Sequence, residues 1–366
     1  MKKFLLLLVV LATAVFLVSC GSTYEIAMIT DTGDIDDGSF NQGTWEGIKK
    51  YAEENKKSHK YYKPAGEATA DYLAAIDLAV SGGAKIVITP GFYFETPIYE
   101  AQTKYPDVKF VLIDGSPHNG DYNVEIKDNT LSVFFAEHEA AFFAGYGSIY
   151  EGFNSVGYMG GIAVPAVQRF GIGYVAGAYY AAKQKNNMTF KFNPTYYHYL
   201  GTFGPSDEYK TLAANWFDAG VNVIHAAAGG AGSSVMAAAA ERTNKWVIGV
   251  DSDQAGASST VISSALKGVG EAAFSALDDF YNDKFVGGRA ITLTAKEDAV
   301  GLPLGDSFRF KTFTVAQYEA ILKNVQDGTV VVPDTAEKLV TFIRDLGFTL
   351  SEADATALTN KVNGTN

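Results

Sequence analysis

From Tyr24 onward, short β-branched and apolar runs alternate with longer segments in which apolar residues recur every three or four positions. Such short runs are typical of buried strands, and the longer segments are typical of amphipathic helices. Strands are predicted at 25–29, 85–89, 109–113, 155–160, 195–200, 221–226 and 246–250. Helices are predicted near 39–55, 68–81, 94–104, 137–151, 167–185, 207–219, 232–243 and 268–284. Because one series of these units lies before about residue 130 and a second lies after it, the pattern predicts two α/β lobes with parallel sheets.

The pattern is harder to interpret from Leu293 on. It predicts helices at 314–325 and 336–346, with a strand and a turn at 328–334 between them. The last residues, 351–366, are polar, and we expect them to be partly disordered.

The first residues carry a targeting signal rather than part of the fold. A short basic start, Met1–Lys3, precedes the almost wholly apolar stretch Phe4–Val18 and a cysteine, Cys20. This pattern is typical of a bacterial lipoprotein signal peptide, 1–19, with Cys20 as the lipidated first residue of the mature protein; an ordinary secretion signal with an incidental cysteine is the alternative. Because Cys20 is the only cysteine, an internal disulfide is excluded. We therefore expect a protein that is lipid-anchored to the cell membrane on its extracytoplasmic side.

Length and charge narrow the class of protein. Removal of the first 19 of 366 residues leaves 347, which is enough for two domains. The formal net charge of the full sequence is −12, and the loss of Lys2 and Lys3 with the signal makes it −14. No basic cluster is dense enough to follow a phosphate backbone, so no nucleic acid partner is expected.

The loops that follow the predicted strands share an unusual composition. They are rich in glycine, aromatic residues and aspartate, and they span 30–38, 90–93, 114–117, 160–163, 201–204, 229–232 and 251–253. In open α/β sheets, ligands bind beyond the carboxyl ends of the strands, where these loops lie. Glycine allows close approach to the backbone, aromatic rings offer flat faces, and carboxylates accept hydrogen bonds from hydroxyl or amino groups. Their recurrence at the same end of successive strands indicates a ligand site there.

Four aspartates crowd the first of these loops, in the stretch DTGDIDDGSF that begins at Asp31. A metal cage, a catalytic carboxylate pair and a site for a polar uncharged ligand are the alternatives. A calcium loop counted from Asp34 would need glycine at its sixth position and glutamate at its twelfth, where the chain has Ser39 and Trp45. No metal is therefore expected, and Asp34 and Asp36 are expected to be solvated.

The residues after these aspartates predict how the next helix begins. Ser39 and Gln42 have the spacing of a capping box, in which Ser39 accepts from the amide of Gln42 and the Gln42 side chain reaches back. Phe40, at the first helical position, lies off the centre of the buried stripe and is therefore a candidate to face a cleft. Packing of Phe40 beneath its own loop is the alternative.

Signatures of catalysis or of a bound cofactor are few. The sequence has no GxSxG elbow, no HExxH pair and no P-loop, and its five histidines show no metal-ligand spacing. The glycines at 171–176 match a loose dinucleotide fingerprint but lie inside a predicted helix, which indicates close helix packing. The glycines at 229–232 do follow a strand and could cradle a phosphate or a neutral polar ligand. We expect a binding protein without enzymatic activity and without a cofactor.

Several motifs, taken in their order along the chain, resemble one protein family. They are DTGDIDDGSFNQGTWEG, VLIDG, EHEAAFFAGY, VGYMGG, GTFG, HAAAGGAG, GVDSDQ and SSALK, spread over roughly residues 20 to 330. This series resembles the basic membrane protein (BMP) family of lipoproteins, which includes the purine nucleoside receptors of ABC importers. The resemblance implies a type I periplasmic-binding-protein fold, in which two Rossmann-like lobes with parallel sheets are joined by three hinge strands and hold one nucleoside between them.

The same resemblance implies how the chain is divided between the lobes. The N-terminal lobe would comprise 20–133 and about 263–285. The C-terminal lobe would comprise about 134–262 and about 286–333, followed by a C-terminal extension at about 334–366.

The family pattern also implies roles for particular residues around a base. It places a base-stacking ring at Phe40 and a carboxylate that reads the base edge at Asp114, with Asp31 and Asn41 nearby. Phe203, in the GTFG motif, is the preferred second stacking ring from the other lobe.

Around the ribose hydroxyls, the resemblance places Asp251, Lys267 and the backbone of Gly229–Gly230. His225 stands at or near the place where the family usually has an aromatic residue, so it either stacks as an imidazole or fills the wall of the site. Pro205 replaces an aspartate that the family tends to carry after the GTFG motif. Both departures affect the second lobe of the implied site.

Together, these features predict a lipid-anchored substrate-binding protein. It would capture a purine nucleoside (adenosine, guanosine or inosine) between two lobes and deliver it to an ABC permease and ATPase. A binder of a ribose-like sugar or another small metabolite is one alternative, and a surface lipoprotein with a role in adhesion or signalling is the other.

Overall fold

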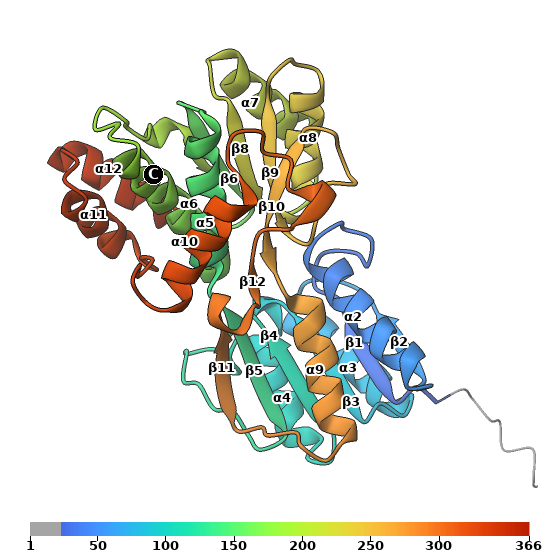
Figure 1. Cartoon of the computed structure of the whole chain (residues 1–366). Coiled ribbons are helices and arrows are strands. Elements are labelled where there is room, and N and C mark those ends of the chain that lie inside the picture. Colours follow the sequence, from blue (N-terminus) through green and yellow to red (C-terminus); the bar gives the residue numbers. More distant parts are fainter. Residues whose placement is uncertain (1–22, 366) are drawn as a thin grey trace, which may run out of the picture.

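The computed structural model describes residues 23–365, which form two α/β lobes one above the other (Figure 1). The predicted signal peptide and Cys20 lie outside the described residues. Each lobe is built around a six-stranded sheet, and helices cover both faces of each sheet. The two lobes predicted from the alternation of strands and helices are therefore confirmed.

The sheet of the first lobe has the strand order β11-β5-β4-β3-β1-β2, and all of its strand pairs are parallel. Its strands are β1 (Ile26–Ile29), β2 (His59–Tyr62), β3 (Ile86–Pro90), β4 (Lys109–Ile113), β5 (Thr130–Phe135) and β11 (Arg289–Leu293). Its helices are α2 (Phe40–Glu54), α3 (Thr69–Ser81), α4 (Glu95–Lys104) and α9 (Val269–Tyr281).

Alternation of side chains along the buried strands gives this lobe a core on each face of its sheet. Ile26 and Met28 of β1 belong to the same core as Ile48 of α2, whereas Ala27 and Ile29 belong to a separate core with residues of α3 and α4. This two-residue period is the expected result of a pleated strand that is covered on both faces.

The sheet of the second lobe repeats this plan, with the order β12-β10-β9-β8-β6-β7, in which only β12 is antiparallel to its neighbour. Its strands are β6 (Val156–Gly160), β7 (Tyr197–Tyr199), β8 (Val223–Ala227), β9 (Trp246–Asp251), β10 (Val261–Lys267) and β12 (Val300–Gly301). Its helices are α5 (Glu137–Glu151), α6 (Pro165–Gln184), α7 (Asp207–Asp218) and α8 (Gly232–Ala240). Short 3₁₀ turns lie at Phe92–Phe94, Pro194–Tyr196, Gly229–Ala231, Ala295–Glu297 and Gly305–Ser307.

Helices α5 and α6 pack closely on one face of this sheet. A Cβ atom added to Gly173 would lie 1.9 Å from the carbonyl oxygen of His138, and one added to Gly177 would lie 2.0 Å from that of Phe142. Only glycine permits this approach, so the close helix packing predicted for 171–176 is confirmed. The packing holds the amino-terminal part of α6, which lines the cleft described below, at a fixed separation from α5.

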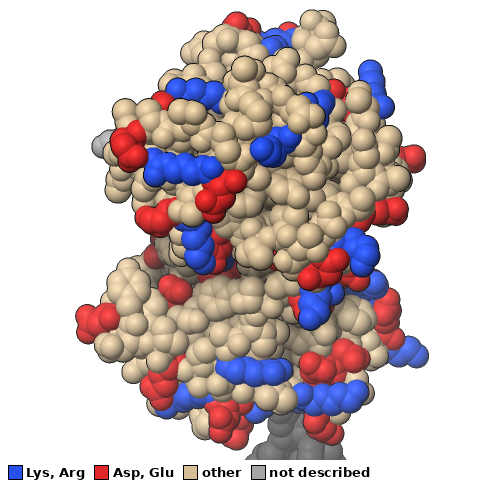
Figure 2. Space-filling view, turned by 60° about the vertical axis from the view of Figure 1, so that its left-hand side comes forward, with Lys and Arg blue, Asp and Glu red and all other residues tan. Residues whose placement is uncertain are grey.

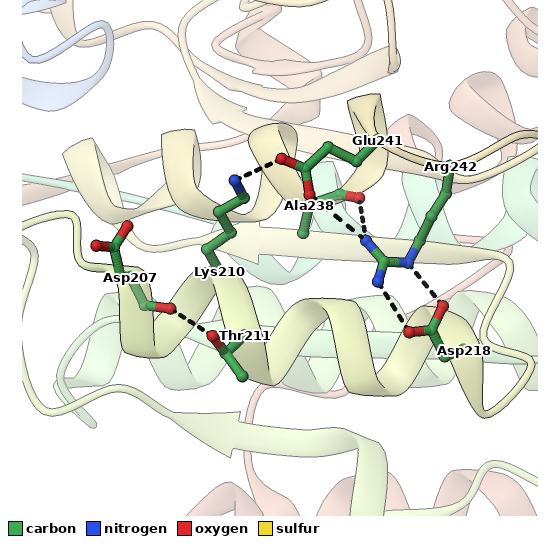
Figure 3. Close-up of polar contacts among 7 residues, drawn as sticks. All are labelled: Asp207, Lys210, Thr211, Asp218, Ala238, Glu241 and Arg242. Atoms are coloured by element: carbon green, nitrogen blue, oxygen red, sulfur yellow. Dashed lines mark hydrogen bonds and ion pairs between the residues drawn. The ribbon is translucent and has the colours of Figure 1, made fainter.

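Helices α7 and α8 cover the other face, and ion pairs on the surface join them (Figure 3). Lys210 on α7 lies 2.6 Å from Glu241, and Arg242, just after α8, lies 2.7 Å from Asp218 at the end of α7. Exposed ion pairs of this kind contribute little to stability. Substitutions that remove them can therefore serve as controls for substitutions of buried ion pairs.

The chain passes between the lobes three times, as expected for three hinge segments. The crossings lie at Ala136 after β5, at Gly268 between β10 and α9, and at 294–299 between β11 and β12. Two segments differ from the lobe division that the family resemblance implied. Residues 263–267 of β10 belong to the second sheet through their pairing with β9, and 289–293 of β11 belong to the first sheet through their pairing with β5.

The C-terminal helices differ most from the sequence-based expectation. Helices α10 (Val315–Gln326), α11 (Ala336–Asp345) and α12 (Glu352–Val362) gather beside α5 and α6 of the second lobe (Figure 1). The strand predicted at 328–334 is wrong, because the segment between α10 and α11 pairs with no other strand. The disorder expected at 351–366 is also wrong for the described residues, since Ala355, Leu358 and Val362 form a buried stripe on α12.

Candidate functional site: a cleft between the lobes

A cleft of about 1090 Å³ lies between the two lobes, where the surface narrows in the space-filling view (Figure 2). Each sheet has a switch point, where the chain continues to one side from one strand and to the other side from its neighbour. The switch point lies between β1 and β3 in the first sheet and between β6 and β8 in the second. The loops that line the cleft follow the carboxyl ends of these strands, which is where open α/β sheets bind ligands. Nine of the ten predicted ligand-binding residues line it: Asp31, Phe40, Asn41, Asp114, Phe203, Gly229, Gly230, Asp251 and Lys267.

The aspartate-rich loop begins helix α2 by a different device from the predicted capping box. The Ser39 side chain makes no capping bond. Instead, the carboxylate of Asp37 accepts hydrogen bonds from the backbone amides of Ser39 at 2.8 Å, Asn41 at 3.0 Å and Gln42 at 3.1 Å. Gln42 reaches back to the amide of Gly38 at 2.8 Å. A carboxylate, with two acceptor oxygens and a full charge, satisfies more free amides than a hydroxyl can, which explains why Asp37 replaces Ser39.

Asn41 is engaged within the protein and holds Asp31 in place. Its side-chain amide donates to Asp31 Oδ1 at 2.8 Å and to Asp37 Oδ2 at 3.0 Å, and its oxygen accepts from the Asp31 amide at 3.3 Å. Since both donor hydrogens are used and only 3% of the residue is exposed, the geometry makes Asn41 a positioning residue rather than a direct ligand contact. The other two aspartates of the loop, Asp34 and Asp36, are exposed, as predicted.

The surroundings of Asp31 affect its pKa and the space that its carboxylate occupies. Burial raises the pKa of Asp31 to about 6, while the Gly33 amide and the Asn41 side chain oppose that shift. A Cβ atom at Gly91 would lie 2.9 Å from Asp31 Oδ2, so glycine at this position leaves room for the carboxylate beside the loop that follows β3. Asp31 is therefore a carboxylate held in the cleft with a pKa above its ordinary value, and it is mostly ionised at pH 7.

Aromatic rings line the cleft from both lobes. Phe40, at the start of α2, lines it from the first lobe, and the ammonium nitrogen of Lys267 lies 4.9 Å from the centre of its ring. Phe203 lines it from the second lobe and packs against Gly161, where an added Cβ atom would lie 2.3 Å from the ring. Aromatic rings contributed by both lobes suit a planar ligand.

A buried charge cluster forms the base of the cleft. The ammonium of Lys267 forms an ion pair with Asp114 Oδ2 and lies 3.1 Å from Glu137 Oε1. Arg169 Nε then donates to Glu137 Oε2 at 2.6 Å. Burial alone would lower the pKa of Lys267, but Asp114, Glu137 and Asp251 together hold that pKa above its ordinary value. Lys267 therefore remains a cation although only 3% of the residue is exposed.

The pKa values of the two carboxylates, Asp114 and Glu137, are shifted in opposite directions. Burial raises the pKa of Asp114 to about 6, with Glu137 and Asp251 adding to the shift and Lys267 opposing it. Burial would also raise the pKa of Glu137, but Lys267 and Arg169 outweigh it and hold that pKa below its ordinary value. Glu137 is thus the fixed anion of the cluster, and Asp114 is the acid that can change its protonation.

Glu137 and Arg169 are the main cluster residues that sequence reasoning missed. Glu137 begins α5, whose first turn also carries Glu139, and Arg169 lies in the second turn of α6; the middle of each helix is mostly apolar. A buried charge needs a partner, so charges of opposite sign near the starts of two largely apolar helices were a usable signal for a pair. What the sequence could not show is that α5 and α6 bring them together.

Two aspartates at matching strand ends share an uncommon backbone conformation. Asp114 follows β4 and Asp251 ends β9, and each has a φ angle of +61°. Asp114 Oδ1 is buried without a hydrogen-bond partner among the described residues. Asp251 Oδ2 accepts from the Ser39 hydroxyl of the first lobe at 2.7 Å. Left-handed conformations of residues with side chains concentrate at functional sites, where the surrounding structure holds them.

His225 does not reach the cleft. It is fully buried, its Nδ1 lies 3.2 Å from the carbonyl oxygen of Ile248, and the rings of Tyr158, Phe170 and Tyr174 surround it. Burial lowers the pKa of His225 to about 4, so the imidazole is neutral at pH 7. Of the two roles left open for His225, the geometry favours filling the wall; Phe170, which sequence reasoning did not single out, lines the cleft in front of it.

The described residues 23–365 contain no group of histidine, cysteine, aspartate or glutamate side chains that could hold a metal ion. Within the same part of the chain, no helix has the length and apolar character needed to cross a membrane.

The sequence is similar to one characterised group of proteins along most of its length. Residues 24–334 match a family model described as ABC transporter substrate-binding protein PnrA-like. The chain is 29% identical to the ABC transporter nucleoside-binding protein BmpA of Lactococcus lactis subsp. cremoris, over 84% of this chain and 89% of that protein. It is also 29% identical to basic membrane protein A of Borreliella burgdorferi, over 93% of this chain and 98% of the relative.

Solved structures show the same arrangement of lobes. An ABC transporter solute-binding protein from Aeropyrum pernix K1 superimposes with a TM-score of 0.73 at 24% identity, over 91% of this chain and 99% of that chain. A second, from Conexibacter woesei, gives a TM-score of 0.64 at 19% identity, over 85% of this chain and 99% of that chain. The predicted type I periplasmic-binding-protein fold, with two Rossmann-like lobes, is confirmed.

Proposed function

Because the chain belongs to the PnrA-like family of ABC transporter substrate-binding proteins, as the BMP-family motifs predicted, we propose that it captures a purine nucleoside between its lobes. We further propose that Cys20 carries the lipid that anchors the protein outside the cytoplasmic membrane, and that an ABC permease and ATPase receive the nucleoside. The protein would perform no chemistry on its ligand.

The observation that carries this proposal is the pair of phenylalanines that line one cleft from different lobes. With a base between Phe40 and Phe203, each stacked face would contribute about 1 to 3 kcal/mol, by analogy with base stacking in nucleic-acid binders. A ligand that contacts one ring from each lobe would also favour closure, because it can contact both rings only when the lobes approach each other.

Carboxylates that line the same cleft could accept hydrogen bonds from the edge of a base. Asp31 and Asp114 line the cleft, and Asp114 Oδ1 has no partner among the described residues. We propose that these groups accept hydrogen bonds from the amino or imino groups of the base. A ligand without such donors would leave buried acceptors unpaired, which costs about 1 to 3 kcal/mol for each group.

The remaining polar groups suit a ribose. We propose that Asp251 accepts from a ribose hydroxyl through Oδ1, since Oδ2 already accepts from Ser39. Lys267 and the backbone of Gly229–Gly230 line the same cleft and would complete the sugar contacts. Charge-assisted hydrogen bonds to hydroxyl groups are stronger than neutral ones, which favours a nucleoside over a free base.

Charge in the cleft favours a ligand without phosphate. Eight carboxylates line the cleft: Asp31, Asp34, Asp36, Asp37, Glu67, Glu95, Asp114 and Asp251. The only lysine and arginine side chains in its lining, Lys267 and Arg169, are both engaged with carboxylates. A phosphate group would meet a negative potential without a free cation, so we expect nucleosides to bind and nucleotides to be rejected.

The test is a calorimetry and thermal-shift panel on residues 21–366, stripped of co-purified ligand. The panel contains adenosine, guanosine, inosine, cytidine, uridine, the free bases, AMP, ribose and galactose. A ligand at a hundred times its Kd should add roughly 2.7 kcal/mol of apparent stability, so binding will be easily detected. The proposal predicts binding of purine nucleosides that Phe40→Ala weakens by tenfold or more and that Tyr61→Ala, on an exposed ring outside the cleft lining, leaves unchanged.

Other outcomes separate the alternatives. Stabilisation by ribose or galactose but by no nucleoside would contradict the proposal and support a sugar receptor. Silence from the whole panel, with the protein folded, would contradict both and support a role in adhesion or signalling.

A further inference from the structure

The segment after residue 334 lies behind one wall of the cleft. The family match ends at residue 334, so α11 and α12 lie beyond its last matched residue. Helix α12 packs on α6 and β7 of the second lobe, with Leu358 and Val362 buried in that interface. Asp354 at its first turn forms an ion pair with Lys191 at 2.9 Å. These contacts attach α12 firmly to the second lobe.

The carboxyl end of α12 contacts residues that lead to the cleft. The hydroxyl of Tyr199, the last residue of β7, donates to the carbonyl oxygen of Val362 at 2.7 Å. The ring of Tyr199 covers Gly160, the last residue of β6, where an added Cβ atom would lie 2.7 Å from it. Just after α12, a Cβ atom added to Gly364 would lie 2.7 Å from the Cβ of Ala163, which lines the cleft.

The loop after β6 in turn supports Phe203. The ring of Phe203 packs against Gly161 so closely that an added Cβ atom there would lie 2.3 Å away. The backbone of the Phe203 loop is attached at the same place, because the amide of Leu200 donates to Gly160 O and that of Gly201 to Gly161 O, each at 2.9 Å. An unbroken series of contacts therefore runs from α12 through Tyr199 and Gly160–Gly161 to Phe203.

We propose that α12 is a positioning element for the ligand cleft, which holds the Gly160–Val164 loop and, through it, the ring of Phe203 at the separation from Phe40 that a stacked base requires. The ligand named in this inference rests on the proposed function, whereas the contacts from α12 to Phe203 do not depend on it. A small displacement of the Phe203 ring would weaken binding, because a planar ligand must fill the space between two rings without a gap. Residues 351–365 would then set the affinity of the site although none of them lines the cleft.

Two small changes test the proposal without removing the core contacts of α12. Tyr199→Phe deletes the hydroxyl, which donates to Val362 O and lies 3.1 Å from the Tyr197 hydroxyl, and Gly364→Ala adds a methyl group that would press on Ala163. Because Gly364 has a φ angle of +69°, alanine is also strained there, so Gly328→Ala, at a φ angle of +77° with open space around the added Cβ atom, is the control for strain alone. Thr356→Ala, on the exposed face of α12, is the matched control. We expect Tyr199→Phe and Gly364→Ala each to weaken binding of the best purine nucleoside by about threefold to tenfold, equivalent to roughly 0.7 to 1.4 kcal/mol, with no change for Thr356→Ala.

A ligand-free readout separates this inference from the proposed function. The amides of Gly161 and Gly201 donate within the second lobe, to Ala227 O and Gly161 O, so their hydrogen exchange reports the order of this wall directly. We expect faster exchange at both amides in Tyr199→Phe and Gly364→Ala than in the wild type or Thr356→Ala. If the wild-type protein binds no nucleoside, the proposed function fails, and the exchange rates alone decide whether α12 positions the wall.

A double-mutant cycle tests whether the effect passes through Phe203. In a Phe203→Ala background the stacking ring is absent, so Gly364→Ala should cause little further loss of affinity. An equal loss with and without Phe203 would show that α12 acts on the ligand by another route and would overturn the proposal. Unchanged exchange together with unchanged affinity in both Tyr199→Phe and Gly364→Ala would overturn it as well.

Discussion

Lys267, the last residue of β10 in the second lobe, forms a buried ion pair with Asp114, which follows β4 in the first lobe. The pair lies next to two of the three crossings between the lobes, since Gly268 follows Lys267 directly and Ala136 precedes Glu137, the second partner of this lysine. One ammonium group is thus shared between carboxylates of the two lobes, at the base of the cleft and beside the hinge. A ligand that engages Asp114 or Lys267 would act on this shared contact as well as on the site.

Removing the cation from this cluster should destabilise the protein in a pH-dependent way. Lys267→Met would leave Asp114 and Glu137 buried without their shared partner, and breaking a buried ion pair typically costs about 3 to 5 kcal/mol. Because Lys267 opposes the effect of burial on the pKa of Asp114, its loss should raise that pKa further. Protonation of Asp114 would then relieve the unpaired charge, so the loss of stability should be larger at pH 7 than at pH 5.

Urea denaturation of the ligand-free protein at the two pH values measures this difference. Lys210→Met, which removes an exposed ion pair with Glu241 on α7 and α8, is the matched control and should have little effect at either pH (Figure 3). An equal loss at pH 5 and pH 7 for Lys267→Met would show that Asp114 does not take up the proton.

Asp31 should make the ligand-free protein less stable as the pH rises through about 6. Burial raises the pKa of Asp31 from 3.8 to about 6, so the folded state binds the proton more tightly than the unfolded state does. The favourable contribution is complete below pH 4 and is lost as the pH rises to about 6, by at most about 3 kcal/mol at roughly 1.36 kcal/mol per pKa unit.

Asp31→Asn cancels this dependence because an amide does not titrate. The difference in unfolding free energy between wild type and Asp31→Asn should therefore fall as the pH is raised from 4 to 7, and comparison of the two proteins removes the contribution of every other titrating group. A difference that stays constant over this range would mean that Asp31 keeps its ordinary pKa in the folded protein.

The start of α2 should depend on Asp37 rather than on Ser39. Asp37→Ala removes the acceptor of three backbone amides and is expected to destabilise the protein by about 1 to 2 kcal/mol. Ser39→Ala removes a contact between the lobes, to Asp251, but no capping bond. Thermal unfolding of both variants would rank them, and an unchanged stability for Asp37→Ala would contradict the capping of α2 by Asp37.

Substitution of His225 should leave ligand binding nearly unchanged. The imidazole is buried behind Phe170 and does not line the cleft, so His225→Gln should alter nucleoside affinity by less than about threefold, which is under roughly 0.7 kcal/mol. Calorimetry on this variant, beside Phe170→Ala as a change within the cleft lining, measures the contrast. A tenfold loss for His225→Gln would instead support the stacking role.

Local pattern was sufficient for much of this protein. Helix and strand positions follow from the spacing of apolar residues, as α4 at Glu95–Lys104 and β4 at Lys109–Ile113 show. The solvated state of Asp34 and Asp36 and the helix-packing role of Gly173 could also be predicted, because each depends on neighbours within a few residues or on a single helix face. The aspartates at the strand ends could be placed together at one edge, where they line the cleft, because parallel strands always carry their carboxyl ends to the same edge.

Five strands were not predicted: β2, β5, β10, β11 and β12. Of these, β5 and β10 are buried and lie inside their sheets, so their apolar residues were a signal that sequence reasoning missed. Strands at the sheet edges were harder to predict. β2 and β11 are partly exposed and carry polar residues, so they lack the apolar run that identifies a central strand, and their pairing with β1 and β5 decides their place. The same holds for α12, where only three buried side chains distinguish a packed helix from a polar tail.

Only the tertiary structure decided which polar groups become partners. Asp37 takes the Gln42 amide that Ser39 was expected to cap, and the Ser39 hydroxyl instead donates to Asp251, more than 200 residues away. Lys267 meets Asp114 and Glu137 because three crossings between the lobes bring β10, β4 and α5 to one place. Periodicities that act over a few residues predicted most of the helices and several of the strands. The contacts that shape the cleft join residues far apart in the chain, and their geometry exists only once the two sheets have formed and the hinge has brought them together.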